Sequence, residues 1–227
     1  MRLVNIRPRR ATALALGALP IALLVFAYIL ASASRHAINP ADRILPTPAA
    51  MVSAIHALAF VPDPMTGELT LWTDTLASLK RLALGLAIST LSALIVGLAL
   101  GLVPLIRAAF GPIVTIIALI PPIALLPILF IVFGLGETAK VALIVIGILP
   151  VMIRDVAQHV EALPTEQMLK AQTLGASSWQ LAIRVALPQM MPRLIHALRL
   201  ALGPAWVFLI SAEAIAADVG LGYRIFL

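Results

Sequence analysis

Long stretches without a charged residue divide the chain into apolar segments separated by short polar ones. Residues 11–34, 82–106 and 108–136 carry no charge over 24, 25 and 29 positions, respectively. Each stretch exceeds the roughly 20 residues that a helix needs to cross a hydrocarbon core of about 30 Å. The pattern therefore predicts three membrane-spanning helices.

Two shorter apolar runs predict two more spans. Residues 141–153 and 200–212 are uncharged over 13 positions each. We expect both helices to extend past Lys140, Arg154 and Arg199, because long basic side chains can reach the lipid head groups. The predicted fold is an all-α, polytopic membrane protein with about five spans.

Composition supports the bilayer as the solvent of this chain. Hydrophobic residues form 62% of the 227 and charged residues only 11%, whereas a soluble domain carries about 25% charge. The absence of cysteine excludes disulfides, thiolate metal sites and cysteine nucleophiles. We expect no catalytic residue and no metal site, because the four histidines are isolated, namely His36, His56, His159 and His196.

The net charge of +6 is explained by membrane topology rather than by nucleic acid, because the basic residues flank the spans. With a cytoplasmic N-terminus, ten of the sixteen Lys and Arg residues fall on the cytoplasmic side: Arg2, Arg7, Arg9, Arg10, Arg107, Arg154, Lys170, Arg184, Arg193 and Arg199. The positive-inside rule favours this orientation, with a short turn at Arg107. The first span is expected to be an uncleaved anchor, because it exceeds the roughly 7–15 apolar residues of a signal peptide. Residues 31–33 (ASA) nevertheless resemble a cleavage site.

Residues 1–34 thus form a tail and first span, and residues 35–75 an external connection. Asn39-Pro40 and residues 45–48 are turn signals. Residues 48–58 have apolar positions at helical spacing, with Pro48 near the start. This short helix is expected to lie in the membrane interface, with docking to a partner protein as the alternative.

The second and third predicted spans carry small residues and prolines. Gly97-x-x-x-Gly101 predicts close helix packing, and the nearby hydroxyl residues Ser89 and Ser92 are candidates for a translocation path. Pro121-Pro122 removes two backbone donors and predicts a break near mid-membrane. Such a break is either a structural kink or part of a transport pathway.

The last predicted span ends in two polar residues, Ser211 and Glu213, which are further path candidates. Charged residues inside membranes are costly and often functional. Two alternatives remain open for Glu213: a place at the external interface, or a pair with a basic residue. Residues 133–138 predict an external turn that caps the helix after the proline break.

Residues 154–199 are predicted to form the main cytoplasmic loop. Pro164 and Glu166 favour a helix start there, and Gly175 is a natural helix stop. Ser177 or Ser178 can cap a second helix over residues 179–186, which is expected to end before Leu187-Pro188. The loop is therefore expected to contain two short helices joined at a glycine.

This loop resembles the signature of the permease subunits of binding-protein-dependent ABC importers. That signature reads E-A-A, three residues, G, nine residues, I-x-L-P. Ala171, Gly175, Leu187 and Pro188 match it at the correct spacing, and Val185 replaces Ile. Leu169 and Lys170 replace the first Glu and Ala, so Glu166, three positions earlier, is the candidate substitute for the acidic contact.

Other segments resemble the branch of this family that serves nitrate, sulfonate, taurine and bicarbonate. They are residues 46–48 (PTP), 75–81 (TLASLKR), 120–127 (IPPIALLP), 133–136 (FGLG), 174–180 (LGASSWQ), 212–215 (AEAI) and 220–223 (GLGY). The resemblance covers about residues 40–227, with the permease core at 76–227. Family members usually have six spans, so the sequence is expected to be incomplete and to lack the last one.

The resemblance implies a non-enzymatic transport subunit in the bacterial cytoplasmic membrane. It implies three protein partners besides membrane lipid: an ATPase subunit that binds the ATP, a second permease copy, and an extracytoplasmic solute-binding protein. The chain itself would need no cofactor. The residues implied to contact the ATPase are Glu166, Leu169, Lys170, Ala171, Gly175, Ala176, Ser177, Val185, Leu187 and Pro188. An ATP-independent carrier and a membrane-embedded enzyme are the alternatives.

Overall fold

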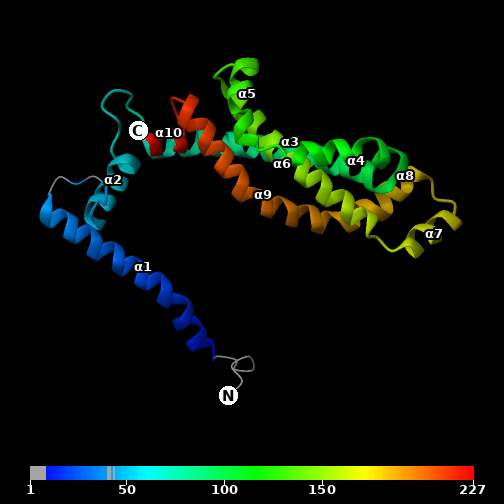
Figure 1. The fold of residues 1–227 in the computed structure, drawn as a ribbon, viewed down its shortest axis with the longest axis horizontal. Coiled ribbons are helices and arrows are strands. Elements are labelled where there is room, and N and C mark those ends of the chain that lie inside the picture. The colour runs from blue at the N-terminus through cyan, green and yellow to red at the C-terminus, as the bar shows by residue number, and fades with distance from the viewer. Residues whose placement is uncertain (1–8, 40–41, 43) are drawn as a thin grey trace. The chain divides into compact units, whose positions relative to one another are not determined.

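The computed structural model of the chain describes residues 9–39, 42 and 44–227, in which helices are joined by short connections and no strand is present (Figure 1). The basic residues Arg2 and Arg7 of the predicted tail, the turn residue Pro40 and Arg43 lie outside the described residues. The chain divides into two compact units, Met1–Thr70 and Leu71–Leu227.

The first unit contains two helices, α1 (Arg10–Ile38) and α2 (Pro48–Phe60). The predicted short helix is confirmed, since Pro48 opens α2 and the hydroxyl of Thr47 accepts a hydrogen bond from the Ala50 N–H. The Tyr28 hydroxyl donates to the Pro46 carbonyl at 2.6 Å, which holds the connection against α1. The helix α1 is long and apolar enough to span a membrane.

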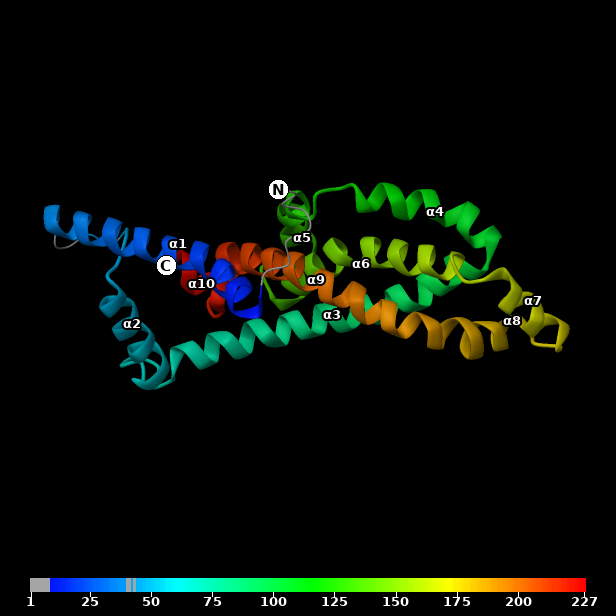
Figure 2. The same cartoon turned by 90° about the horizontal axis from the view of Figure 1, so that it is seen from below.

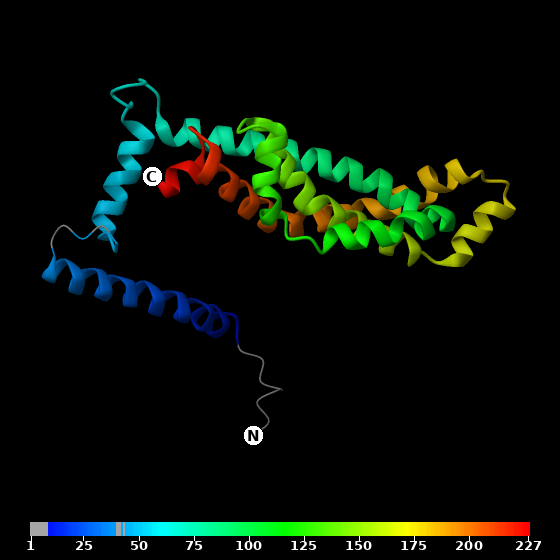
Figure 3. The same ribbon diagram turned by 45° about the horizontal axis from the view of Figure 1, so that its top comes forward.

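The second unit contains the remaining helices. They are α3 (Thr70–Leu102), α4 (Pro104–Ala118), the 3₁₀ turn η2 (Pro122–Leu125), α5 (Leu126–Phe133), α6 (Glu137–Glu161), α7 (Thr165–Thr173), α8 (Ser178–Gln180), the π-helical turn η3 (Leu181–Ala186), α9 (Leu187–Ala216) and α10 (Leu221–Phe226). The short helices α7 and α8 lie at one end of this unit and α10 at the other (Figures 1, 2 and 3).

The span prediction agrees with the helices observed. Across the described residues, α1, α3, α6 and the continuous helix Ser178–Ala216 are long and apolar enough to cross a membrane. The third predicted span is broken as expected, because α4 and the η2–α5 segment meet at an angle of 86°. Pro121 is extended at the break and Pro122 opens η2, so the consecutive prolines end one helix and start the next.

A seam of glycines brings α3 against α6. A Cβ atom built on Gly97 would lie 2.7 Å from the Cβ of Val156, and one on Gly101 would lie 2.4 Å from the Cβ of Val160. Both distances are below normal van der Waals contact, so only glycine permits this approach. The close helix packing predicted from Gly97 and Gly101 is confirmed.

The core of the second unit lies between α3, α6 and α9. Its fully buried side chains include Ile144 of α6 and Leu209 of α9, together with Ala93 of α3. Large apolar side chains also point outward along the same helices, such as Leu91 and Ile95. An apolar core and an apolar outer face together suit helices whose solvent is lipid.

The predicted end of the second span and the predicted turn at Arg107 are wrong. The second span does not run to residue 106, because α3 ends at Leu102 and Pro104 starts α4. Arg107 therefore lies in the first turn of α4 rather than in a connecting turn. Both helices that flank the polar stretch 154–199 extend into it as expected, because α6 contains Arg154 and continues to Glu161, and α9 contains Arg199.

The predicted helix end before Leu187-Pro188 is also wrong. The helix runs from Ser178 to Ala216 without a break. The residues before Pro188 form the π turn η3, whose hydrogen bonds skip five positions instead of four. A proline cannot donate the usual bond to the carbonyl four residues earlier, and the wider turn accommodates that loss without ending the helix.

Candidate functional site

The segment between α6 and α9 folds into a tight turn around Gly175. Gly175 has φ of +85°, a left-handed conformation that residues with a Cβ adopt at a cost. Its N–H donates to the Gln172 carbonyl at 2.9 Å, and the Ala176 N–H donates to the Ala171 carbonyl at 3.0 Å. These two bonds form a Schellman motif. Ala171, Gly175 and Ala176 thus set the shape of the turn.

A capping box starts the next helix directly after this turn. The Ser177 hydroxyl accepts a bond from the Gln180 N–H, and the Gln180 side chain accepts one from the Ser177 N–H. This identifies Ser177 as the cap, which the sequence had left open between Ser177 and Ser178. The turn and the cap together fix α7 relative to the long helix that begins at Ser178.

The turn presents apolar side chains outward. Leu174 and Trp179 are 80% and 74% exposed, and Leu169 of α7 is also exposed. Next to them lies a hollow of about 740 Å³ between Met168 and Trp179 on one side and Leu102 of α3 on the other. The charged residues Glu166 and Lys170 are exposed on α7, while Val185 and Leu187 are half-buried and Pro188 is exposed. The surface around the turn is thus partly apolar and partly charged.

Arg107 ties the helix ends next to this surface together. Its Nε donates to the Leu100 carbonyl at 3.0 Å and its Nη2 to the Gly101 carbonyl at 2.6 Å. It also forms an ion pair with Glu161 at the end of α6. Because the last carbonyls of a helix lack partners within it, Arg107 caps α3 and joins it to α4 and α6.

The hydroxyl residues predicted as path candidates are dispersed. Ser89 is fully buried in α3, and its hydroxyl has no hydrogen-bond partner in the described part of the chain. Ser92 is half-buried. The Ser211 hydroxyl donates to the Val207 carbonyl of its own helix at 2.8 Å. The described hydrogen bonds join none of these three to Glu213, and Pro121 and Pro122 lie at the break after α4.

Glu213 belongs to a charged cluster at the end of the unit opposite α7. This cluster consists of Asp74, Ser78, Arg81, Glu137, Lys140, Glu213 and Arg224. Glu213 has no exposed surface. Its carboxylate accepts bonds from the Ser78 hydroxyl at 2.8 Å, Arg81 Nη1 at 2.7 Å and the Gly222 N–H at 2.8 Å. The alternative in which Glu213 pairs with a basic residue is confirmed.

Arg81 joins Glu213 to a second carboxylate, that of Glu137. Arg81 is 7% exposed, and its Nη2 donates to Glu137 Oε1 at 2.7 Å while its Nε donates to Oε2. Lys140 Nζ donates to the same Glu137 Oε1 at 3.1 Å. One carboxylate at the start of α6 therefore receives a guanidinium fork and an ammonium group.

The cluster also binds the segment that follows α9. Asp74 accepts a bond from the Gly220 N–H at 2.8 Å and one from Arg224 Nε at 2.7 Å. Gly220 has φ of +143°, and a Cβ there would lie 2.7 Å from Oε2 of Glu213. Glycine is required at this position by both conformation and space. The segment 217–227 is thereby held against α3 and α9.

Sequence reasoning did not identify Asp74, Ser78 and Arg81 as members of a site. They occur at spacings of four and three positions on α3, which place them on one face of the helix. This spacing was the available signal. It could not reveal that the partner carboxylate lies 132 positions away, on α9.

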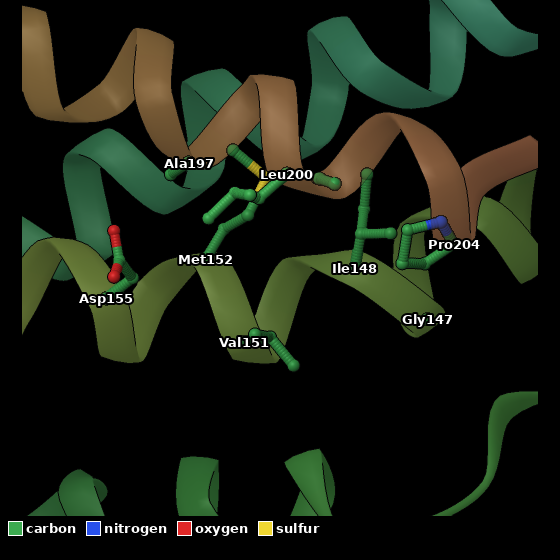
Figure 4. Close-up of a pocket in the computed structure, with 9 residues that line it drawn as sticks. Gly147, Ile148, Val151, Met152, Asp155, Ala197, Leu200 and Pro204 are labelled. Atoms are coloured by element: carbon green, nitrogen blue, oxygen red, sulfur yellow. The ribbon is translucent and has the colours of Figure 1, made fainter. Parts of the chain in front are cut away.

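A separate crevice of about 150 Å³ lies between α6 and α9. Figure 4 shows Met152 and Ile148 of α6 between the two helices, with Leu200 and Pro204 on the α9 side. Asp155 lies at one end of the crevice (Figure 4). Its lining is otherwise apolar, so the crevice suits lipid or side-chain packing more than a charged solute.

Several known permease proteins are similar to this chain. The chain is similar to the taurine transport system permease protein TauC of Escherichia coli, with 38% identity over 70% of this chain and 58% of the relative. It is similar to the bicarbonate transport system permease protein CmpB of Synechococcus elongatus, with 31% identity over 68% of this chain and 56% of that protein. The nitrate import permease protein NrtB of the same organism is 29% identical over 66% and 54%.

The chain spans less than two thirds of the length of each of these relatives. The family model described as "Binding-protein-dependent transport system inner membrane component" matches residues 85–227. That range contains the glycine seam, the proline break, the turn at Gly175 and part of the charged cluster. The chain belongs to the family of inner-membrane components of binding-protein-dependent transport systems.

Proposed function

We propose that this chain is the membrane-spanning subunit of an ATP-driven importer. It contributes to the translocation path of a small solute, with anions as the favoured class, and couples passage to ATP hydrolysis on a separate subunit. The names of the relatives support this solute class, since they specify taurine, nitrate and bicarbonate. The chain itself requires no cofactor in this proposal, because the ATP is bound by the partner.

The observation that carries the proposal is the turn at Gly175. It is held by Schellman bonds and a capping box, and it presents the exposed side chains of Leu174 and Trp179. A rigid protrusion between two spans can transmit the movement of a bound ATPase to the helices. The proposed contact residues are those of the family signature and its neighbours: Glu166, Leu169, Lys170, Ala171, Gly175, Ala176, Ser177, Val185, Leu187 and Pro188.

Leu169 and Lys170 change the chemistry of this contact. The family has an acidic residue at the position of Leu169, whereas here an exposed leucine stands there. We assign the acidic contact to Glu166, which is exposed one turn earlier on α7. Leu169 then adds apolar contact area next to Leu174.

The partners in this proposal are an ATPase subunit, a second copy of this chain and an extracytoplasmic solute-binding protein. The site of action is the bacterial cytoplasmic membrane, with surrounding lipid and a cytoplasmic N-terminus. The excess of basic residues on the N-terminal tail and near the Gly175 turn supports this orientation. The charged cluster then lies at the external end of the spans.

Two substitutions at one position test the coupling role. Gly175→Val places a β-branched residue at φ of +85° and should distort the turn, whereas Gly175→Asn should preserve it, because asparagine tolerates this conformation. We expect the valine variant to insert into the membrane but to lose ATPase co-purification and solute uptake in proteoliposomes. The asparagine variant should retain both.

Gly203→Val is the matched control, since a Cβ there meets no atom within 4 Å and its φ is not positive. It should support uptake of radiolabelled taurine, nitrate or bicarbonate as well as the unaltered protein does. Normal uptake and ATPase binding by the Gly175→Val protein would overturn the coupling role.

A further inference from the structure

The two carboxylates bound to Arg81 are held very differently. Glu213 is fully buried and receives bonds from a hydroxyl, a guanidinium and a backbone N–H. The Glu137 side chain is 62% exposed, although both cations that bind it are buried, Arg81 at 7% and Lys140 at 4%. Glu137 is therefore the carboxylate that can leave, while Glu213 is fixed.

The charges around Arg81 show what net charge would remain if Glu137 turned away from Arg81 and Lys140. Arg81 and Lys140 contribute two positive charges, and Glu137 and Glu213 contribute two negative ones. With Glu137 turned into solvent, the remaining three side chains carry one net positive charge. A buried site with one uncompensated positive charge favours a monovalent anion, because desolvated charges require a partner.

The donor geometry indicates the chemistry of that anion. Nε and Nη2 of Arg81 form one edge of a planar fork, and both bind the oxygens of Glu137. Lys140 Nζ adds a donor to one of the same oxygens. Such a fork matches ligands with two oxygens on one central atom, as in carboxylates, nitrate, bicarbonate and sulfonates. The carboxylate of Glu137 occupies the place that such an oxyanion would take.

We propose that Arg81 and Lys140 form a transient binding site for a monovalent oxyanion solute, which Glu137 fills as an internal competitor when the site is empty. This inference rests on the proposed function, which places the cluster at the external end of the spans. Glu137 reaches the surface, so an arriving solute can meet the site there and displace it. The neutral, closed cluster re-forms once the solute moves on.

The test is an anion titration of the purified full chain in a neutral maltoside detergent. Thermal unfolding midpoints are measured against sodium nitrate and sodium methanesulfonate, with sodium chloride holding the ionic strength constant. In Glu137→Gln the competitor is neutral, so the half-saturating concentration of either oxyanion should fall about tenfold relative to the unaltered chain. Equal responses of the two proteins would overturn the proposal.

Lys140 is tested in the same Glu137→Gln background, where its removal leaves the neutral Arg81–Glu213 pair intact. Adding Lys140→Met should raise the half-saturating oxyanion concentration about tenfold, and adding Lys140→Arg should not. Lys80→Gln is the matched control, since Lys80 is an exposed cation directly beside Arg81 in sequence, and it should leave the titration unchanged. If Lys80→Gln raised the half-saturating oxyanion concentration as much as Lys140→Met does, the effect would come from the overall positive charge of the protein. That result would overturn the proposal.

A phosphate head group has the same chemistry, so the titration is repeated with phosphatidylglycerol added to the micelles. If nitrate binds without lipid and the lipid competes with it, the result supports the solute site. Stabilisation by phosphatidylglycerol alone would assign the site to lipid and overturn the proposal. Because the titration requires no ATPase, its failure is separable from failure of the proposed function, which the Gly175 variants test.

Discussion

Replacing Gly101 with alanine tests the glycine seam between α3 and α6. The added Cβ would lie 2.4 Å from the Cβ of Val160 and 3.0 Å from the Ala157 carbonyl oxygen, whereas ordinary contact begins at 3.4 Å. The two helices would have to separate by about 1 Å along a well-packed seam. Overpacking of this kind costs about 1–3 kcal/mol. We expect Gly101→Ala to lower the free energy of unfolding by about 2 kcal/mol.

The assay is unfolding in mixed detergent micelles, followed by circular dichroism as the SDS fraction rises. Gly203→Ala is the control, since a Cβ there meets nothing within 4 Å, and its expected change is below about 1 kcal/mol. Val160→Gly supplies the reciprocal test, because it removes the side chain that the new methyl meets. The double variant should therefore lose less than the sum of the single losses, by about 1 kcal/mol.

Two outcomes would refute the close approach of α3 and α6 at Gly101. In the first, Gly101→Ala costs no more than Gly203→Ala, which would mean that α3 and α6 are not in contact at this depth. In the second, the effects of Gly101→Ala and Val160→Gly add without interaction, which would mean that the two side chains do not share one space.

Four further substitutions probe the polar contacts by the same unfolding assay. Glu213→Gln should cost about 3 kcal/mol, because it removes the carboxylate of a buried pair while Arg81 retains Glu137; an unchanged stability would contradict the cluster. Ser78→Ala should lower the free energy of unfolding by about 1–3 kcal/mol, because the Ser78 hydroxyl donates to Glu213. Ser89→Ala should be neutral or stabilising, because the Ser89 hydroxyl has no partner in the described part of the chain. A larger loss for Ser89→Ala than for Ser78→Ala would be inconsistent with the observed bonds. Arg107→Gln should cost about 1–2 kcal/mol through loss of the α3 cap and should weaken ATPase co-purification; full retention of both would exclude a role in joining the helix ends.

The parts of the fold that were predictable are those encoded by neighbouring residues. Apolar run lengths gave the spans, Pro121-Pro122 gave the break, and Pro48 and the pair Ser177-Ser178 marked helix starts. Each of these depends on physics that acts within a few positions. The same reasoning was wrong at Pro188, because a π turn offered a way to continue the helix that a proline rule does not include.

The charged cluster was predictable only in fragments. Glu213 was identified as an unusual acid, but its partner Ser78 lies 135 positions away and Arg224 lies 150 positions from Asp74. These contacts depend on how α3 packs against α9, and a single sequence does not specify that packing. The turn at Gly175 was more accessible, because all of its hydrogen bonds lie within residues 170–181.

The long helix from Ser178 to Ala216 can carry a movement from one end of the second unit to the other. Its 39 residues correspond to a length of about 58 Å at 1.5 Å per residue. The Gly175 turn is attached to one end, and Glu213 lies near the other. A tilt of about 5° around the midpoint would shift each end by about 2.5 Å in opposite directions. Force applied at the turn would thus pass along this helix, through the π turn and past Pro192 and Pro204, to the Arg81–Glu213 ion pair.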